Sequence, residues 1–186
     1  ALVLGADAVV LFTALGGDTE SSMIDILSSV GRECAALGMP FIAEAEFPTT
    51  YATVEELKQQ YGFEYLRRNV RLCAELGADI VKTNWPGDPE GFAKLVDATN
   101  GIPVVLAGGS RLEDKELLWR MQVAVEAGAI GCSVGRNIFM HASPEAITSY
   151  SRLAVHPSSR NTTRWSGASP GSRSASASPS WRESSA

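Results

Sequence analysis

The chain has 186 residues, of which 45% are hydrophobic and 20% are charged. This balance is typical of one globular domain, and no apolar run reaches the ~18 residues of a transmembrane helix. The net charge of −5, without a lysine-rich run, argues against nucleic acid as the main partner, because phosphate neutralisation needs clustered cations. We therefore expect a cytoplasmic protein that binds neither membranes nor nucleic acid.

The cysteines and histidines indicate whether the chain has disulfide bonds or a metal site. The three cysteines, Cys34, Cys73 and Cys132, are an odd number without a CxxC pair. They argue against a disulfide framework or a structural zinc site and fit a reducing cytosol. The only histidines, His141 and His156, are too few and too far apart to suggest an imidazole metal site. We expect no metal and no other cofactor.

The composition changes abruptly after residue 155. From His156 onward there is no Leu, Ile, Val, Phe or Met, so this segment cannot bury enough apolar area to offset its ordering entropy. We predict a domain over residues 1–155 and a disordered Ser/Arg-rich tail over 156–186. A change of reading frame, an artificial extension and a natural tail remain open as its origin. The start resembles a helix end closed by Gly5, which suggests a fragment.

Residues 1–155 alternate between short apolar runs and helical stretches. The runs are rich in β-branched residues and span residues 6–12, 40–45, 78–83, 102–107 and 129–134. Helix starts are marked by Asp88 and Ser143, each followed by proline, and glycines such as Gly38, Gly77 and Gly128 precede strands. This order predicts five parallel strands joined by right-handed crossovers.

Loop chemistry distinguishes a closed barrel from a doubly wound sheet. No GxGxxG motif follows the first run, whereas glycine-rich loops follow the fourth and fifth runs. In TIM barrels the loops after the last two strands commonly cradle phosphate with backbone N–H groups. The candidate phosphate-binding residues are Gly108, Gly109, Ser110, Gly135 and Arg136. Alternatively, the glycines only turn tight loops and Arg136 pairs with an acidic neighbour.

Lys82 occupies the carboxyl end of the third apolar run, an edge that faces the catalytic side of a barrel. Desolvation and a neighbouring cation are expected to lower the pKa of its ammonium group and so supply a nucleophilic amine. The alternative is a strand-end lysine that reaches solvent or pairs with a carboxylate. Trp85 follows this run and is interpreted either as a pocket wall or as a packing residue.

Two carboxylates accompany this lysine in the neighbouring run, where strand alternation places Ile42, Glu44 and Glu46 on one face. An outer face covered by helices would make them costly to desolvate, so we expect both to point into the barrel mouth. Glu46 is the candidate acid/base and Glu44 a candidate pocket residue. A structural salt bridge from Glu46 to Lys82 or Arg136 is the competing interpretation.

Three segments carry a resemblance to a known family. The stretches GADIVKTNWPGDPEGF, IPVVLAGGS and AVEAGAIGCSVGRNIFMHASPEAI, in this order, resemble the archaeal-type class I fructose-bisphosphate aldolases. That group also includes the aminodideoxyheptulosonate synthases and autoinducer-2-phosphate thiolases. The resemblance implies a TIM (β/α)8 barrel in which Lys82 is the Schiff-base lysine on strand six. The visible strands are then four to eight, without strands one to three and the aspartate on strand one.

The resemblance also implies an activity and a substrate class. It indicates a lyase that acts on a phosphorylated ketose or related phospho-keto compound, and a homo-oligomer at full length. The family has a tyrosine just before Pro48, where this chain has Glu46 when counted from the strand start or Phe47 when counted from the proline. A transferase or thiolase with the same lysine and a non-catalytic fragment are the alternative functions.

Overall fold

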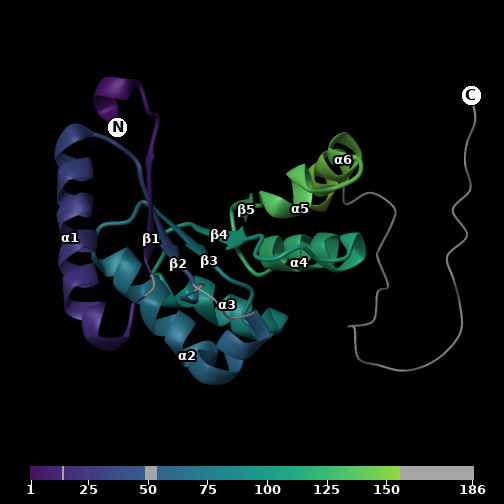
Figure 1. Ribbon diagram of the computed structural model, residues 1–186, viewed down its shortest axis with the longest axis horizontal. Helices are drawn as coiled ribbons and strands as arrows, with labels where there is room; N and C mark the ends of the chain where they lie inside the picture. The colour runs from purple at the N-terminus through teal and green to yellow at the C-terminus, as the bar shows by residue number, and fades with distance from the viewer. Residues whose placement is uncertain (14, 49–53, 156–186) are drawn as a thin grey trace, which may run out of the picture. The chain divides into compact units, whose positions relative to one another are not determined.

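The computed structural model describes residues 1–13, 15–48 and 54–155, and Figure 1 shows its ribbon. The tail predicted for residues 156–186 lies outside the described residues. The strands are β1 (Val9–Thr13), β2 (Phe41–Ala45), β3 (Ile80–Thr83), β4 (Val104–Ala107) and β5 (Gly131–Ser133). All five lie inside the runs predicted from sequence except for the final residue of β1.

The sheet is parallel throughout, and its strands follow the chain in the order β1-β2-β3-β4-β5. This confirms the predicted parallel α/β architecture. Among the described strands, β1 and β5 pair on one side only. Parallel edges left open in this way are normally closed or covered in folded proteins.

Helices and short turns connect the strands. They are η1 (Leu2–Leu4), η2 (Gly17–Thr19), α1 (Glu20–Leu37), α2 (Val54–Glu75), α3 (Pro89–Ala98), α4 (Asp114–Glu126), α5 (Arg136–Phe139) and α6 (Pro144–Val155). Asp88 caps α3 by accepting a hydrogen bond from Gly91 N at 2.7 Å, as its sequence context predicts. In the described part, no helix has both the length and the apolarity to cross a membrane.

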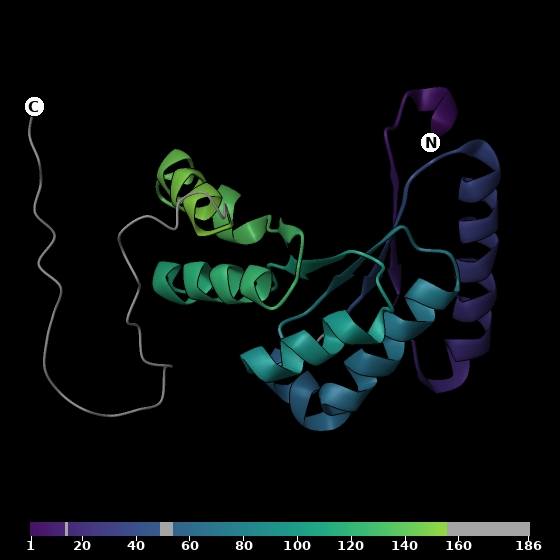
Figure 2. The same ribbon diagram turned by 180° about the vertical axis from the view of Figure 1, so that it is seen from behind.

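The main helices follow the strand order along one face of the sheet. Figures 1 and 2 show α1, α2, α3 and α4 arranged in turn from β1 to β5, with α6 beside α4. Phe41, Ala43 and Ala45 of β2 are buried beneath this helix layer. On the opposite face, Val10 and Phe12 are 56% and 40% exposed, so the described residues leave that face largely uncovered.

Gly31 lies where α1 packs tightly against the backbone that follows α2. A Cβ at this position would lie 2.5 Å from the carbonyl oxygen of Leu76, which follows α2. Alanine is ordinarily a better helix former than glycine by ~1 kcal/mol, but a backbone clash at this distance forces α1 away from α2. We expect Gly31→Ala to lower the free energy of unfolding by about 2 kcal/mol.

Urea denaturation followed by circular dichroism measures this change. Ser22→Ala, at an exposed position of the same helix, is the matched control and should leave stability within about 0.5 kcal/mol. A Gly31→Ala protein as stable as the wild type would show that α1 and α2 do not meet at this point.

Candidate active site

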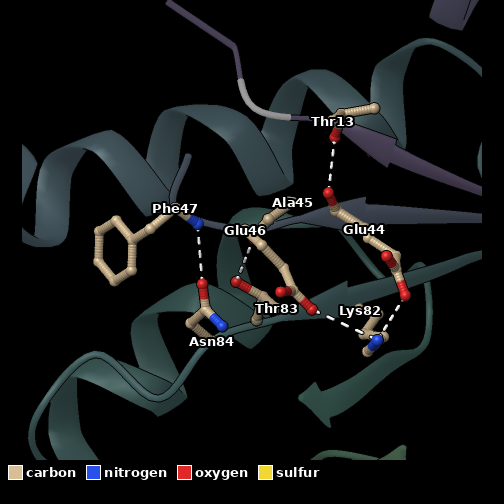
Figure 3. A network of polar contacts seen from close by, with 8 residues as sticks. All are labelled: Thr13, Glu44, Ala45, Glu46, Phe47, Lys82, Thr83 and Asn84. Atoms are coloured by element: carbon tan, nitrogen blue, oxygen red, sulfur yellow. Dashed lines mark hydrogen bonds and ion pairs between the residues drawn. The ribbon is translucent and has the colours of Figure 1, made fainter. Parts of the chain in front are cut away.

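Three charged side chains meet at the carboxyl edge of β2 and β3, on the face away from the helices. The sheet register places Glu44 directly beside Lys82, and the Lys82 ammonium donates a hydrogen bond to Glu44. Glu46 lies two residues further along the chain, with its Oε1 atom 3.4 Å from Nζ of Lys82. Figure 3 shows both carboxylates directed at the same nitrogen. The site is a lysine held between two carboxylates.

The site is sheltered without being closed. The side chains of Glu44, Glu46 and Lys82 are 18%, 14% and 19% exposed. A small molecule can therefore approach Nζ, while the partial loss of water strengthens the interactions among the charges. Within the described residues, no cluster of three or more His, Cys, Asp or Glu side chains is arranged to hold a metal ion.

The expected fall in the pKa of Lys82 is wrong for this structure. Burial alone would lower that pKa, but the hydrogen bond to Glu44 and the negative charges of Glu46 and Glu44 outweigh it and raise the pKa above the usual value. The sequence indicated a neighbouring cation, whereas the neighbours are two anions. Lys82 is therefore an ammonium in the resting state, and a base must remove its proton before it can attack a carbonyl.

Glu46 has the electrostatic character of a proton carrier. Burial raises the pKa of its carboxyl group, the charge of Lys82 lowers it and the charge of Glu44 raises it again, with a net upward shift. A carboxyl group with a raised pKa holds a proton nearer to neutral pH, which general acid/base chemistry requires. The adjacent Lys82 is the group with which it can exchange that proton.

Asn84, which sequence reasoning missed, fixes the end of the strand that carries Glu46. It is only 5% exposed, and its Oδ1 atom accepts a hydrogen bond from Phe47 N at 2.8 Å. A side-chain hydrogen bond from Asn84 to Glu46 also lowers the pKa of Glu46. The signal available in the sequence was spacing, because Asn84 lies two residues after Lys82 and continues the same face of the chain.

Two buried threonines align the strands at the same level. Thr13 Oγ1 of β1 donates to the carbonyl oxygen of Glu44, and Thr83 Oγ1 of β3 donates to that of Ala45, both at 2.8 Å. Figure 3 shows these bonds on either side of β2. The backbone that presents the two carboxylates is therefore held from both neighbouring strands.

Phe47 and Glu46 lie on opposite sides of the chain. Phe47 is buried, and its ring stacks on Tyr65 in the helix layer with ring centroids 5.9 Å apart. Glu46 faces Lys82 instead. Of the two residues that stand near the position of the family's tyrosine, only Glu46 is therefore placed to act on Lys82.

The interpretation of Trp85 as a pocket wall is wrong. Its ring is buried between Phe92 and Trp119, at centroid distances of 5.8 and 5.5 Å, and the guanidinium of Arg120 lies 5.8 Å from the ring centroid. These partners belong to the helix layer, on the face of β3 opposite to Lys82. Large apolar area and an available cation favour this packing over exposure beside the site.

The candidate phosphate-binding residues lie in the loop after β4 and in the segment that leads from β5 into the first residue of α5. Gly108 N donates to Ser133 O at 3.1 Å, and a Cβ at Gly108 would lie 3.0 Å from Cα of Val134, so the loops touch. Arg136 is exposed and makes no ion pair with any described residue. The structure thus brings together the predicted set: Gly108, Gly109, Ser110, Gly135 and Arg136.

The three cysteines are free thiols, and two of them are expected to be unreactive. Burial raises the pKa of Cys73 to about 11 and that of Cys132 to about 12. At pH 8 about one Cys73 side chain in a thousand is then a thiolate, which is the reactive form.

We expect Cys73 and Cys132 to react with iodoacetamide at pH 8 at least about 100-fold more slowly in the folded protein than in urea. Mass spectrometry of timed samples measures the rates, and equal rates in both conditions would contradict the burial.

Comparisons with known proteins fit this geometry. The model of the DeoC/LacD family aldolases matches residues 1–141. A 2-amino-3,7-dideoxy-D-threo-hept-6-ulosonate synthase of Halobacterium salinarum is 39% identical over 82% of this chain and 55% of its own length. A second such synthase, of Archaeoglobus fulgidus, is 34% identical over 84% of this chain and 55% of its own length.

Solved structures point the same way. A Schiff base-forming fructose-1,6-bisphosphate aldolase aligns with a TM-score of 0.74 at 26% identity, over 83% of this chain and 60% of that protein. An archaeal fructose-1,6-bisphosphate aldolase whose catalytic lysine carries a carbinolamine intermediate aligns at 0.69 and 27% identity, over 82% and 59%. The five strands thus match part of a TIM-barrel aldolase, and the chain spans about half the length of its curated relatives.

Proposed function

This chain belongs to the DeoC/LacD family of aldolases, and we propose that it carries the imine-forming site of a class I aldolase, with Lys82 as the nucleophile. The observation that supports this most strongly is the placement of Lys82 between Glu44 and Glu46 at the carboxyl edge of the sheet. A purely structural ion pair needs one carboxylate, whereas imine chemistry needs a partner that accepts the lysine proton and later returns it.

The first step is activation of the lysine. Glu46, whose Oε1 atom lies 3.4 Å from Nζ, takes a proton from the ammonium of Lys82 and leaves a neutral amine. The amine adds to the carbonyl carbon of the substrate, and proton transfer gives a neutral carbinolamine. Glu44 keeps the lysine oriented through its hydrogen bond.

The second step uses the proton that Glu46 now holds. Glu46 donates it to the carbinolamine hydroxyl group, which leaves as water, so that Lys82 and the substrate carbon form an iminium ion. The iminium accepts the electron pair of the carbon–carbon bond next to it as that bond breaks, which gives an enamine and an aldehyde. As that bond breaks, the ionised Glu46 is the base that takes the proton from the hydroxyl group on the carbon that becomes the aldehyde.

We assign the substrate phosphate to the loops beyond β4 and β5. The glycines allow close backbone approach, and Arg136 supplies an exposed cation with a planar fork of donors. All strands are parallel, so these loops lie at the same edge of the sheet as Lys82. The substrate is then a phosphorylated ketose or a related phospho-keto compound, handled in the cytoplasm, where free thiols are stable.

The names of the sequence relatives favour a second candidate. The relatives in Halobacterium salinarum and Archaeoglobus fulgidus are named as heptulosonate synthases, and a synthase can use the same lysine to pass an enamine to a different carbonyl acceptor. The two candidates share every step up to the enamine. They differ only in the acceptor.

Proton exchange tests the shared steps. The 186-residue chain is incubated with dihydroxyacetone phosphate in D2O, and NMR follows loss of the proton on the carbon next to the carbonyl, which a base removes from the iminium as the enamine forms. We expect stereospecific exchange well above the buffer rate, because an iminium acidifies that position. Exchange at the buffer rate would overturn the proposed function for this chain.

A further inference from the structure

A buried asparagine joins the two candidate phosphate loops. Asn137, in the short helix α5, is 3% exposed. Its Nδ2 atom donates to the carbonyl oxygens of Gly108 at 3.0 Å and Ser110 at 3.1 Å. Its Oδ1 atom accepts from Leu112 N at 2.6 Å. Every hydrogen bond that this side chain makes goes to residues 108–112, which belong to the loop after β4.

Further contacts attach the same loop to the segment around α5. Arg111 Nη1 donates to the carbonyl oxygen of Met140 at 2.9 Å. His141 Nε2 lies 3.0 Å from Oδ2 of Asp114, at the start of α4. Asn137 is the one buried side chain among these polar links. A buried amide with three good hydrogen bonds holds its neighbours more firmly than exposed side chains do.

We propose that Asn137 is the positioning residue of the phosphate site, which it preorganises without touching the phosphate. The carbonyl oxygens of Gly108 and Ser110 point at the asparagine, so these acceptors are kept away from an incoming anion. The loop is thereby fixed relative to Gly135 and Arg136, on the other side of the site. This inference rests on the phosphate assignment made above for the same loops.

Loss of the Asn137 side chain is expected to reduce the order of the loop after β4. In Asn137→Ala, two carbonyl oxygens and one N–H group lose a buried partner, and the loop gains conformations in which they turn to water. Phosphate must then bind a loop that is not yet ordered, and the ordering reduces the apparent affinity. We expect inorganic phosphate to bind about tenfold more weakly.

Thr99 provides a matched control at the other end of β4. It is as buried as Asn137, and the single hydrogen of its Oγ1 hydroxyl is shared between the carbonyl oxygens of Val96 at 2.8 Å and Ile102 at 2.7 Å. Thr99→Val removes buried hydrogen bonds just before the start of β4, at the opposite end of this strand from the phosphate loops. It should lower stability without changing phosphate affinity.

The experiment titrates inorganic phosphate into the wild-type chain, Asn137→Ala and Thr99→Val, and follows amide NMR shifts of Gly109 and Arg136. We expect saturable shifts in the wild type, the same affinity in Thr99→Val and about tenfold weaker binding in Asn137→Ala. Shifts absent from the wild type, equal affinity in Asn137→Ala, or equal losses in both variants would each overturn the inference.

The outcome is separable from that of the proposed function. Proton exchange from dihydroxyacetone phosphate depends on Lys82, whereas binding of inorganic phosphate involves no imine. A chain that binds phosphate through a loop ordered by Asn137 but shows no exchange would support this inference and overturn the proposed chemistry. Exchange with unaltered phosphate affinity in Asn137→Ala would do the reverse.

Discussion

Lys82→Met should abolish trapping of dihydroxyacetone phosphate by borohydride, with a loss of at least about a thousandfold in adduct yield per unit time. Methionine has a similar length and apolar stem but no amine, so no imine can form and be reduced. The intact mass of the protein after reduction measures the adduct directly.

Lys94→Met is the matched control for this change. Lys94 is also paired with a carboxylate, Glu90, at 2.8 Å, but it is exposed on α3 rather than sheltered at the edge of the sheet. Its replacement should leave the yield of adduct unchanged. Residual trapping in Lys82→Met at the wild-type rate would mean that another amine carries the reaction.

Glu46→Gln should slow imine formation by about a hundredfold, the usual contribution of a positioned acid/base group. Glutamine keeps the size and hydrogen-bonding capacity of Glu46 but can neither take the proton of Lys82 nor give it to the carbinolamine. In the wild type, the rate should rise as the pH rises through the raised pKa of Glu46, because only the ionised carboxylate can take the proton of the Lys82 ammonium. Glu46→Gln should lack this rise, and stopped-flow trapping across pH 5–9 measures it.

Glu44→Gln distinguishes the role of Glu44 from that of Glu46. The hydrogen bond to Glu44 and its negative charge both raise the pKa of Lys82. Removing the charge lowers the pKa of Lys82 and also that of Glu46, which the charge of Glu44 raises. The base is then ionised at a lower pH, so the rising limb of the profile shifts in that direction. The same pH profile in Glu44→Gln and Glu46→Gln would contradict distinct roles for Glu44 and Glu46.

Much of the fold could be predicted from the sequence because local signals and global arrangement agree. The apolar runs are short and follow glycines that end helices, and Asp88 caps α3 as its proline-containing context requires. Alternation in β2 places Glu44 and Glu46 on one face and Phe41, Ala43 and Ala45 on the other, where the structure buries the apolar set. A buried apolar face fixes the register of a strand and therefore the position of its polar neighbours.

The finer features of the site depend on contacts between segments far apart in the chain. The roles of Asn84 and Asn137 could not be predicted from the sequence, because each depends on hydrogen bonds to a segment far away in the chain. The direction of the pKa shift of Lys82 depends on which charges lie within a few ångströms of its ammonium group. The sequence placed both carboxylates on the same side of the sheet, but the expected neighbouring cation is not among the groups that shift this pKa. Trp85 was ambiguous because a loop aromatic can pack on either face of the strand before it.

The most direct test of the account is the identity of the lysine that reacts. The wild-type chain is treated with dihydroxyacetone phosphate and borohydride, digested, and mapped by mass spectrometry over Lys58, Lys82, Lys94 and Lys115. The account predicts that the reduced adduct is confined to Lys82, whose ammonium is held between two carboxylates. An adduct spread evenly over the four lysines, or none at all, would contradict it.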